Sequence, residues 1–339
     1  MNNIIKISLN KQDDHSALMD ILGHVKGSKK CVVIAGAGIS CSGGIPDFRS
    51  ANGLYEMVKQ RFPRSFSSGQ DLFDACLLRN DESIRAFYLF MGMLKEYIIK
   101  ANPTPTHLFL KKLSDVGKLV RVYTQNIDNL EEVVGLQTIS NIKATTKCSA
   151  KVIQLHGTMK SLKCDACSNI VGFESVHCNT LKKGAAPSCP SCEKRETERR
   201  EQKKRYHRVG ELKPTVVLYG DHHPHGLEIG QIAAKDKQKA DCLIVMGTSL
   251  KVIGVKKLVK GFARGIHERG GKVIIVNVTD VTRSKEWNDI IDYQVEGTTD
   301  EWVSLLEKEL DLSKLIDKIA GNQNFLKRPS YLHMISFYF

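Results

Sequence analysis

The feature that most constrains the fold of this 339-residue chain is an apolar run that breaks into glycines, CVVIAGAGIS at residues 31 to 40. The five apolar residues Cys31 to Ala35, bounded by Gly, are typical of a strand buried on both faces, as in parallel sheets. Gly36 and Gly38 would let backbone N–H groups approach an anion, and a helix expected directly afterwards would point its positive end there. The sequence therefore predicts a phosphate-binding turn after a buried strand.

The turn departs from the usual dinucleotide fingerprint, because Cys41 stands at the sixth position and glycines return only at Gly43 and Gly44. An ordinary tight turn between strand and helix is the alternative. Residues 46 to 49, PDFR, add a rigid φ, a carboxylate, an aromatic face and a guanidinium within four positions. That combination favours a ligand site.

Short apolar runs alternate with helical patterns through the rest of the chain, which indicates a doubly wound parallel sheet of the Rossmann type. Residues 51 to 100 are instead helix-rich and aromatic, and we expect a helical insertion there whose aromatic residues form core. The predicted later strands are Leu119 to Tyr123, Val152 to Leu155, Thr215 to Tyr219, Cys242 to Met246, Val273 to Val276 and Ile290 to Val295.

Ligands of such sheets bind beyond the carboxyl ends of the strands, so the residues after each run are the site candidates. Amide and carboxylate groups suited to ribose hydroxyls and a carboxamide follow the second strand. A histidine at a strand end is a candidate base, although a lone histidine is usually structural. The candidates are Gln125, Asn126, Asp128, His156, Gly247, Thr248, Ser249 and Asn277.

Four cysteines have the spacing of a metal site. Cys164 and Cys167 form one C-x-x-C pair, and Cys189 and Cys192 form another. Two such pairs supply four thiolates to one tetrahedral Zn²⁺ in a closed, structural site without an open position for catalysis. Ten cysteines in a chain without a recognisable secretory signal favour reduced thiols and metal ligation over disulfides.

The formal net charge is +13, and residues 182 to 213 hold eleven Lys and Arg against five Glu. This basic run is either a solvated face or a contact for an acidic partner such as DNA. No apolar run approaches the ~20 residues of a membrane span, so no membrane partner is expected. The N-terminal layout, with Asp13, Asp14 and Asp20, favours neither secretion nor organelle import.

The quoted motifs resemble those of the sirtuins, the NAD-dependent protein-lysine deacylases, over roughly residues 28 to 310. GAGIS and GIPDFR at residues 36 to 49 match the family signature, and TQNID, HG, GTS and a strand-end Asn follow in the family's order. Within the family, LYGDHHPHG and GTSLKVIGVKKLV resemble a fungal nuclear branch that deacetylates a core histone lysine. A nuclear location is therefore expected ahead of a cytoplasmic one.

The resemblance implies NAD as cofactor, one structural zinc ion and an acetylated protein or histone peptide as substrate. It implies that the acyl oxygen attacks the nicotinamide ribose carbon, with His156 as base and Asn126 as a second catalytic residue. Val217, Gly220 and Asp221 would contact the substrate, although the family more often has Glu at the last position. The cofactor residues would be Gly36, Ala37, Gly38, Ser40, Asp47, Phe48, Arg49, Gln125, Asn126, Asp128, Gly247, Thr248, Ser249, Asn277, Gly297 and Thr298.

We expect residues 28–50, 101–157 and 213–310 to form the NAD-binding domain. Residues 51–100 and 158–212 would be the helical and zinc-binding insertions of a smaller lobe, with terminal extensions at 1–27 and 311–339. The alternatives are a protein ADP-ribosyltransferase, a deacylase for longer acyl groups and, outside enzymes, a zinc-ribbon nucleic-acid-binding protein. The amides and the histidine at strand ends speak against the last, because a binding module does not need them.

Overall fold

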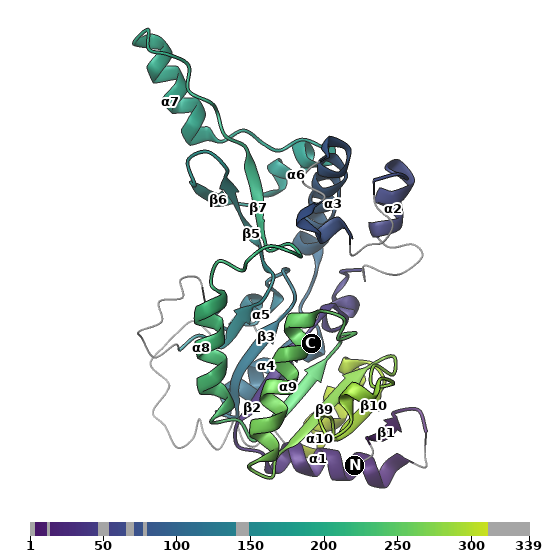
Figure 1. Ribbon diagram of the computed structural model, residues 1–339. Helices are drawn as coiled ribbons and strands as arrows, with labels where there is room; N and C mark the ends of the chain where they lie inside the picture. The colour runs from purple at the N-terminus through teal and green to yellow at the C-terminus, as the bar shows by residue number, and fades with distance from the viewer. Residues whose placement is uncertain are drawn as a thin grey trace, which may run out of the picture.

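The computed structural model describes residues 4–11, 14–46, 54–65, 71–76, 80–139 and 149–310. A large and a small lobe lie end to end (Figure 1). The large lobe holds a seven-stranded parallel sheet in the order β1-β10-β9-β8-β2-β3-β4, which confirms the predicted doubly wound class. Its strands are β1 (Ile5–Ser8), β2 (Cys31–Ala35), β3 (Leu119–Thr124), β4 (Val152–Gln154), β8 (Cys242–Met246), β9 (Lys272–Asn277) and β10 (Tyr293–Glu296).

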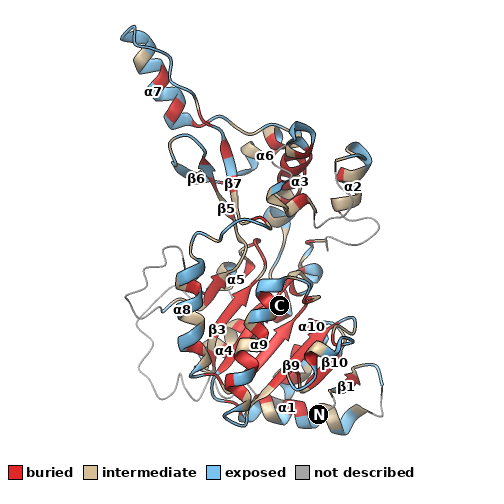
Figure 2. Cartoon of the chain, viewed as in Figure 1, coloured by how far each residue is buried: buried red, intermediate tan, exposed pale blue. Residues whose placement is uncertain are grey.

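The central strand β2 is buried along its whole length because helices cover both faces of the sheet (Figure 2). Cys31, Val33 and Ala35 pack on one face with α1 (His15–Gly27), α4 (Pro105–Asp115) and α10 (Thr299–Leu310). Val32 and Ile34 pack on the other face with α8 (Gly226–Lys237) and α9 (Ile253–His267). The uninterrupted apolar run thus supplies both cores.

The direction in which the chain adds strands reverses beside β2. From β2 the chain continues to β3 and β4 on one side, and it then returns to β8, β9 and β10 on the other. This puts a topological switch point between β2 and β8, where doubly wound sheets bind their ligands.

The small lobe combines the helical and zinc-binding insertions around one core. Leu54, Phe87 and Phe90 from the helices pack in one apolar cluster with Leu162 and Cys164 of the zinc-binding segment. The aromatic residues are therefore largely core, as expected. The elements are α2 (Leu54–Arg61), α3 (Asp81–Lys100), α6 (Ser175–Lys182), α7 (Pro190–Glu201) and an antiparallel sheet of β6 (Ile170–Gly172), β5 (Gly157–Cys164) and β7 (Leu212–Val216).

The predicted strand at Thr215 to Tyr219 is wrong in both bounds and place. The strand β7 ends at Val216 and pairs antiparallel with β5 in the small sheet, outside the parallel sheet. An apolar run of this length does not reveal its partner, because pairing depends on where the zinc-binding segment folds back.

The expected helix directly after the glycines is also wrong. Two short 3-10 turns follow instead, η2 (Ala37–Ile39) and η3 (Cys41–Gly43), and the left-handed Gly44 ends the second. The remaining short elements are η4 (Asp71–Phe73), α5 (Leu130–Val133) and η6 (Lys285–Trp287).

Among the described residues, no helix is both long and apolar enough to cross a bilayer. The proposed division of the chain into domains stays a prediction. The apolar tail at 331–339 lies outside the described residues.

Candidate active site

The phosphate-binding turn and the turn after β8 meet at the switch point with their backbones in contact. The Gly38 N–H donates to the Gly247 carbonyl at 2.9 Å. A Cβ on Gly38 would lie 2.7 Å from Gly247 Cα, and one on Gly36 would lie 2.7 Å from Thr248 Cβ. These glycines are required for close approach, and Gly247 also adopts φ +59.

A chain of buried hydrogen bonds joins the end of β3 to this turn. Asn126 Nδ2 donates to Ser40 Oγ at 3.1 Å, and the Ser40 hydroxyl donates to Asp128 Oδ2 at 2.7 Å. Gln125 Nε2 donates to Thr248 Oγ1 at 2.9 Å. Burial raises the pKa of Asp128, opposed by hydrogen bonds from Leu130 and Ser40. The predicted amides and carboxylate thus lie together at the switch point.

His156 follows β4 with one ring nitrogen fixed and the other available. Its Nδ1 lies 3.0 Å from the carbonyl of Gln125, which can only accept, so Nδ1 carries the proton and Nε2 can act as a base. Burial lowers the pKa of His156, opposed by the bond to Gln125 and reinforced by His223, and this keeps the ring neutral near pH 7. Gly157, with φ +78, then turns the chain into β5.

The other predicted cofactor residues lie along the same edge of the sheet. The Gly297 N–H donates to the Asn277 carbonyl at 3.2 Å, and Asn277 Nδ2 donates to Thr279 Oγ1 at 3.0 Å. Thr298 N and Oγ1 bond to Glu301 at the start of α10. Ala37 and Ser249 lie in the turns after β2 and β8. The predicted cofactor residues Asp47, Phe48 and Arg49 lie outside the described residues.

Among the described residues, Val217 is the only predicted substrate residue that forms a hydrogen bond with a residue of this site. The Val217 N–H donates to the His156 carbonyl at 2.9 Å. Gly220 adopts φ +85, and Asp221 is exposed with its N–H on the Leu218 carbonyl. Between Val217 and Gly220, Tyr219 exchanges backbone hydrogen bonds with residues 73–75, so the backbone of this segment is partly paired.

The four predicted zinc ligands converge. The Sγ atoms of Cys164, Cys167, Cys189 and Cys192 all lie within 4.8 Å of one another, with Cys164 and Cys192 3.8 Å apart. Four thiols at this separation fit a tetrahedral Zn²⁺. Cys178 is buried in the same core but lies outside this group.

Three residues that were not predicted from the sequence contact residues of the site: Asp300, His107 and Glu131. Asp300 accepts from Ser42 Oγ at 2.5 Å and from the Thr106 N–H at 3.0 Å, which ties the glycine turn to α4. His107 and Glu131 lie beside Asp128. The only sequence signal for Glu131 was its place three residues after Asp128, and nothing local linked it to His107.

The sheet is Rossmann-like and carries amides, a carboxylate and a neutral histidine at its switch point, beside a four-cysteine module. This arrangement defines a nucleotide-binding class of enzyme.

The model of the Sir2 family matches residues 36–254. The chain is 42% identical over 336 residues to the NAD-dependent histone deacetylase HST3 of Candida albicans, covering 94% of this chain and 69% of the relative. It is 43% identical over 332 residues to HST3 of Saccharomyces cerevisiae, covering 94% and 74%. The chain belongs to the Sir2 family, the sirtuins.

Solved structures agree with this assignment. A Sir2 homolog in complex with NAD superposes with a TM-score of 0.63 and 25% identity, covering 88% of this chain and 94% of that one. A complex of Sir2 with a p53 peptide and NAD⁺ gives a TM-score of 0.62 and 25% identity, covering 86% and 98%. The fold of both lobes is thus that of a sirtuin.

Proposed function

We propose that this protein is an NAD-dependent protein-lysine deacetylase that acts on histones in the nucleus. The observation that carries the proposal is the placement of His156 at the switch point, with Nδ1 held by Gln125 and Nε2 available as a base. The names of the HST3 relatives support the histone substrate and, through it, the nuclear location.

NAD, when bound, would supply the ribose carbon that the acyl oxygen attacks, nicotinamide as the leaving group and a ribose hydroxyl that finally accepts the acyl group. The residues of the chain bind, orient and accept a proton. Asn126 and Asp128, held through Ser40, orient the nicotinamide end, and Gln125 binds ribose hydroxyls beside Thr248. His156 Nε2 takes the proton of a ribose hydroxyl, for which it must be neutral.

One of the substrate contacts proposed from the family pattern adjoins this base. The Val217 N–H is bonded to the His156 carbonyl, and the chain continues from there through Gly220 to Asp221. We place the acyl-lysine side chain against Val217 and the peptide backbone near Gly220 and Asp221. Tyr219 is already paired with residues 73–75. The peptide backbone would therefore bind to other polar groups of the segment from Val217 to Asp221.

Turnover should fall as the pH drops, because the reaction needs unprotonated His156. Since burial lowers the pKa of this imidazole, we expect the acidic limb of the pH profile of kcat/KM to lie below the usual histidine value of about 6.5. The measurement is kcat/KM for an acetylated peptide across about pH 5 to 8. An acidic limb at or above about pH 6.5 would contradict the inference that burial lowers the pKa of His156.

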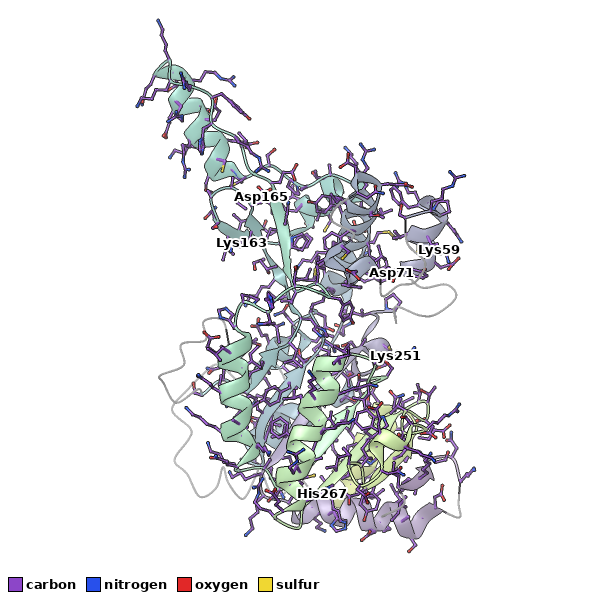
Figure 3. All side chains as sticks on the ribbon, in the orientation of Figure 1. Lys59, Asp71, Lys163, Asp165, Lys251 and His267 are labelled. Atoms are coloured by element: carbon purple, nitrogen blue, oxygen red, sulfur yellow. The ribbon has the colours of Figure 1, made fainter. Side chains whose placement is uncertain are left out.

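We also propose that the basic run at 182–213 contacts nucleosomal DNA. Helix α7 extends away from the rest of the protein, and most of its long side chains are exposed, with Glu196 as the buried exception (Figures 1 and 3). Arg199 donates to the Arg205 carbonyl at 3.0 Å and so fastens the returning chain to the helix. Lys203, Lys204 and Arg205 are exposed and form no ion pair within the described ranges.

The rest of the run is partly neutralised. Asp165, labelled in the small lobe in Figure 3, forms ion pairs with Arg208 at 2.9 Å and Lys213 at 3.2 Å. Lys203, Lys204 and Arg205 are thus three consecutive unpaired cations next to the exposed Tyr206, and Lys194 and Arg195 of α7 are also exposed without an ion pair among the described residues. Unpaired, exposed cations at the end of a projection favour phosphate binding over a role in folding.

Neutralising Lys203, Lys204 and Arg205 together to Gln should weaken nucleosome binding and flatten its salt dependence, because each phosphate contact releases counterions. Deacetylation of a free acetylated peptide should be unchanged. A matched control replaces Lys29, Lys235 and Lys239, which lie at the amino-terminal edge of the parallel sheet, away from α7. An equal effect of both triple variants, or an equal loss on nucleosome and peptide, would rule out the contact.

The deacetylase assignment itself is tested by mass spectrometry of an acetylated histone peptide incubated with the purified protein, with and without NAD. We expect loss of the acetyl group only with NAD. Acetyl loss of the same extent without NAD would mean a hydrolytic mechanism and would contradict the proposal.

A further inference from the structure

A buried group of titratable side chains lies behind the Asp128 carboxylate. His107 from α4, Asp128 and Glu131 from α5 place their polar atoms within 4.8 Å of one another. Their exposed fractions are 0%, 8% and 1%. His107 Nε2 and both carboxyl oxygens of Glu131 have no hydrogen-bond partner among the described residues. Such buried, unpartnered groups are costly, so their protonation states need an explanation.

His107 is held by Thr104, the N-cap of α4, in a capping box. Its Nδ1 lies 3.2 Å from the Thr104 backbone nitrogen and 2.8 Å from Thr104 Oγ1, whose own proton goes to the Ile39 carbonyl. Burial lowers the pKa of His107 to about 4, so the ring is neutral. The charge of the group therefore depends on its two carboxyl groups.

The two carboxyl groups are not equivalent. Asp128 Oδ2 accepts from the Ser40 hydroxyl at 2.7 Å and Oδ1 from the Leu130 N–H at 3.0 Å. No hydrogen bond of ordinary geometry reaches the Glu131 carboxyl from the described residues, and Thr124 and the Glu131 backbone favour its charged form less than burial and Asp128 oppose it. Two ionised carboxylates this close in a buried site repel strongly, and donors favour the charged form of the group that they contact. The negative charge therefore belongs on Asp128 and the shared proton on Glu131.

The surrounding charges agree with this assignment. Burial and, next, the charge of Asp128 raise the pKa of Glu131 to about 8. Glu132 on the same helix adds a smaller repulsion, and Asp300 on α10 faces His107.

We propose that Glu131 is a positioning residue, a neutral carboxylic acid that, with His107 behind it, keeps Asp128 as the single buried carboxylate. Through Asp128 it orients Ser40 and then Asn126 at the nicotinamide end of the site. Its effect on turnover rests on the proposed deacetylase function. Its protonation state does not.

The protonation state is tested by thermal unfolding of wild type and Glu131→Gln across about pH 5 to 8. Above about pH 4.5 the unfolded chain ionises Glu131 while the folded protein keeps the proton, so this group makes wild type lose stability as the pH rises toward 8. The amide of the variant mimics the protonated acid and cannot ionise. The melting temperature of the variant, relative to wild type, should therefore rise with pH. The proposal would be overturned if the difference in melting temperature between variant and wild type stayed constant with pH, or if the variant lost stability relative to wild type as the pH rose.

The positioning role is tested by the pH profile of kcat for nicotinamide release. Wild type should lose turnover as Glu131 ionises near pH 8, whereas Glu131→Gln should keep neutral-pH turnover within about threefold and lack that alkaline loss. The matched control is Glu132→Gln on the next residue, whose carboxylate pairs with Lys160 at 2.7 Å. Because Glu131 is still present, this control should retain the alkaline loss, displaced to a slightly lower pH by removal of the small repulsion from Glu132.

An alkaline loss retained in Glu131→Gln, or a loss of turnover in this variant at every pH, would contradict the positioning role. If neither wild type nor variant released nicotinamide, the proposed function would be wrong. The unfolding comparison would still decide whether Glu131 keeps its proton.

Discussion

His156→Ala should lower the rate of NAD-dependent deacetylation by at least about 100-fold, the lower end for removal of a general base. The reason is geometric, because the Gln125 carbonyl holds Nδ1 and leaves Nε2 as the only imidazole atom able to accept the ribose proton. The measurement is single-turnover deacetylation of an acetylated histone peptide, with the melting temperature and zinc content measured on the same sample.

The matched control is His24→Ala on α1, which packs on one face of the sheet away from the strand-end site. This variant should turn over at the wild-type rate. Near-wild-type activity of His156→Ala would remove His156 from the mechanism. A similar loss of activity in His24→Ala would show that the assay reports a loss of folding and not the loss of a base.

Cys164→Ser should release zinc and strongly destabilise the small lobe. A structural zinc site contributes about 10–16 kcal/mol of apparent binding free energy that is also folding free energy. Cys164, Cys189 and Cys192 are buried in the core that also contains residues of α2 and α3, so loss of the metal should loosen the helices as well. Zinc content by atomic spectroscopy and thermal unfolding measure the effect.

Cys178→Ser is the control for this variant, because Cys178 is buried in the same core but lies outside the group of four thiols. It should keep one equivalent of zinc with a smaller loss of stability. If Cys164→Ser also kept one equivalent of zinc and the parent melting temperature, the ligand assignment would be wrong.

The sequence predicted the elements whose signal is local. Five apolar residues followed by glycines fixed β2 and the turn after it, and the paired C-x-x-C spacing fixed the metal ligands. Polar residues after β3, β4 and β8 could be assigned to one edge because parallel strands end on the same side. These inferences needed only strand order and direction.

Other features depend on pairing between distant segments, which no local pattern records. β1 has only four residues and exists because it pairs with β10 across nearly the whole chain. β7 follows the zinc-binding segment back onto β5, so its apolar run was assigned to the wrong sheet. Glu131 and His107 meet only because α4 packs beside α5.

We expect this chain to couple lysine deacetylation to consumption of NAD. The most direct test is to incubate the purified full chain with NAD and an acetylated histone peptide, and to measure the nicotinamide released and the peptide deacetylated in the same reaction. We predict equal amounts of both, with no nicotinamide above background when the peptide is unacetylated. Nicotinamide release with ADP-ribose left on the protein and the acetyl group intact would contradict the account and identify an ADP-ribosyltransferase.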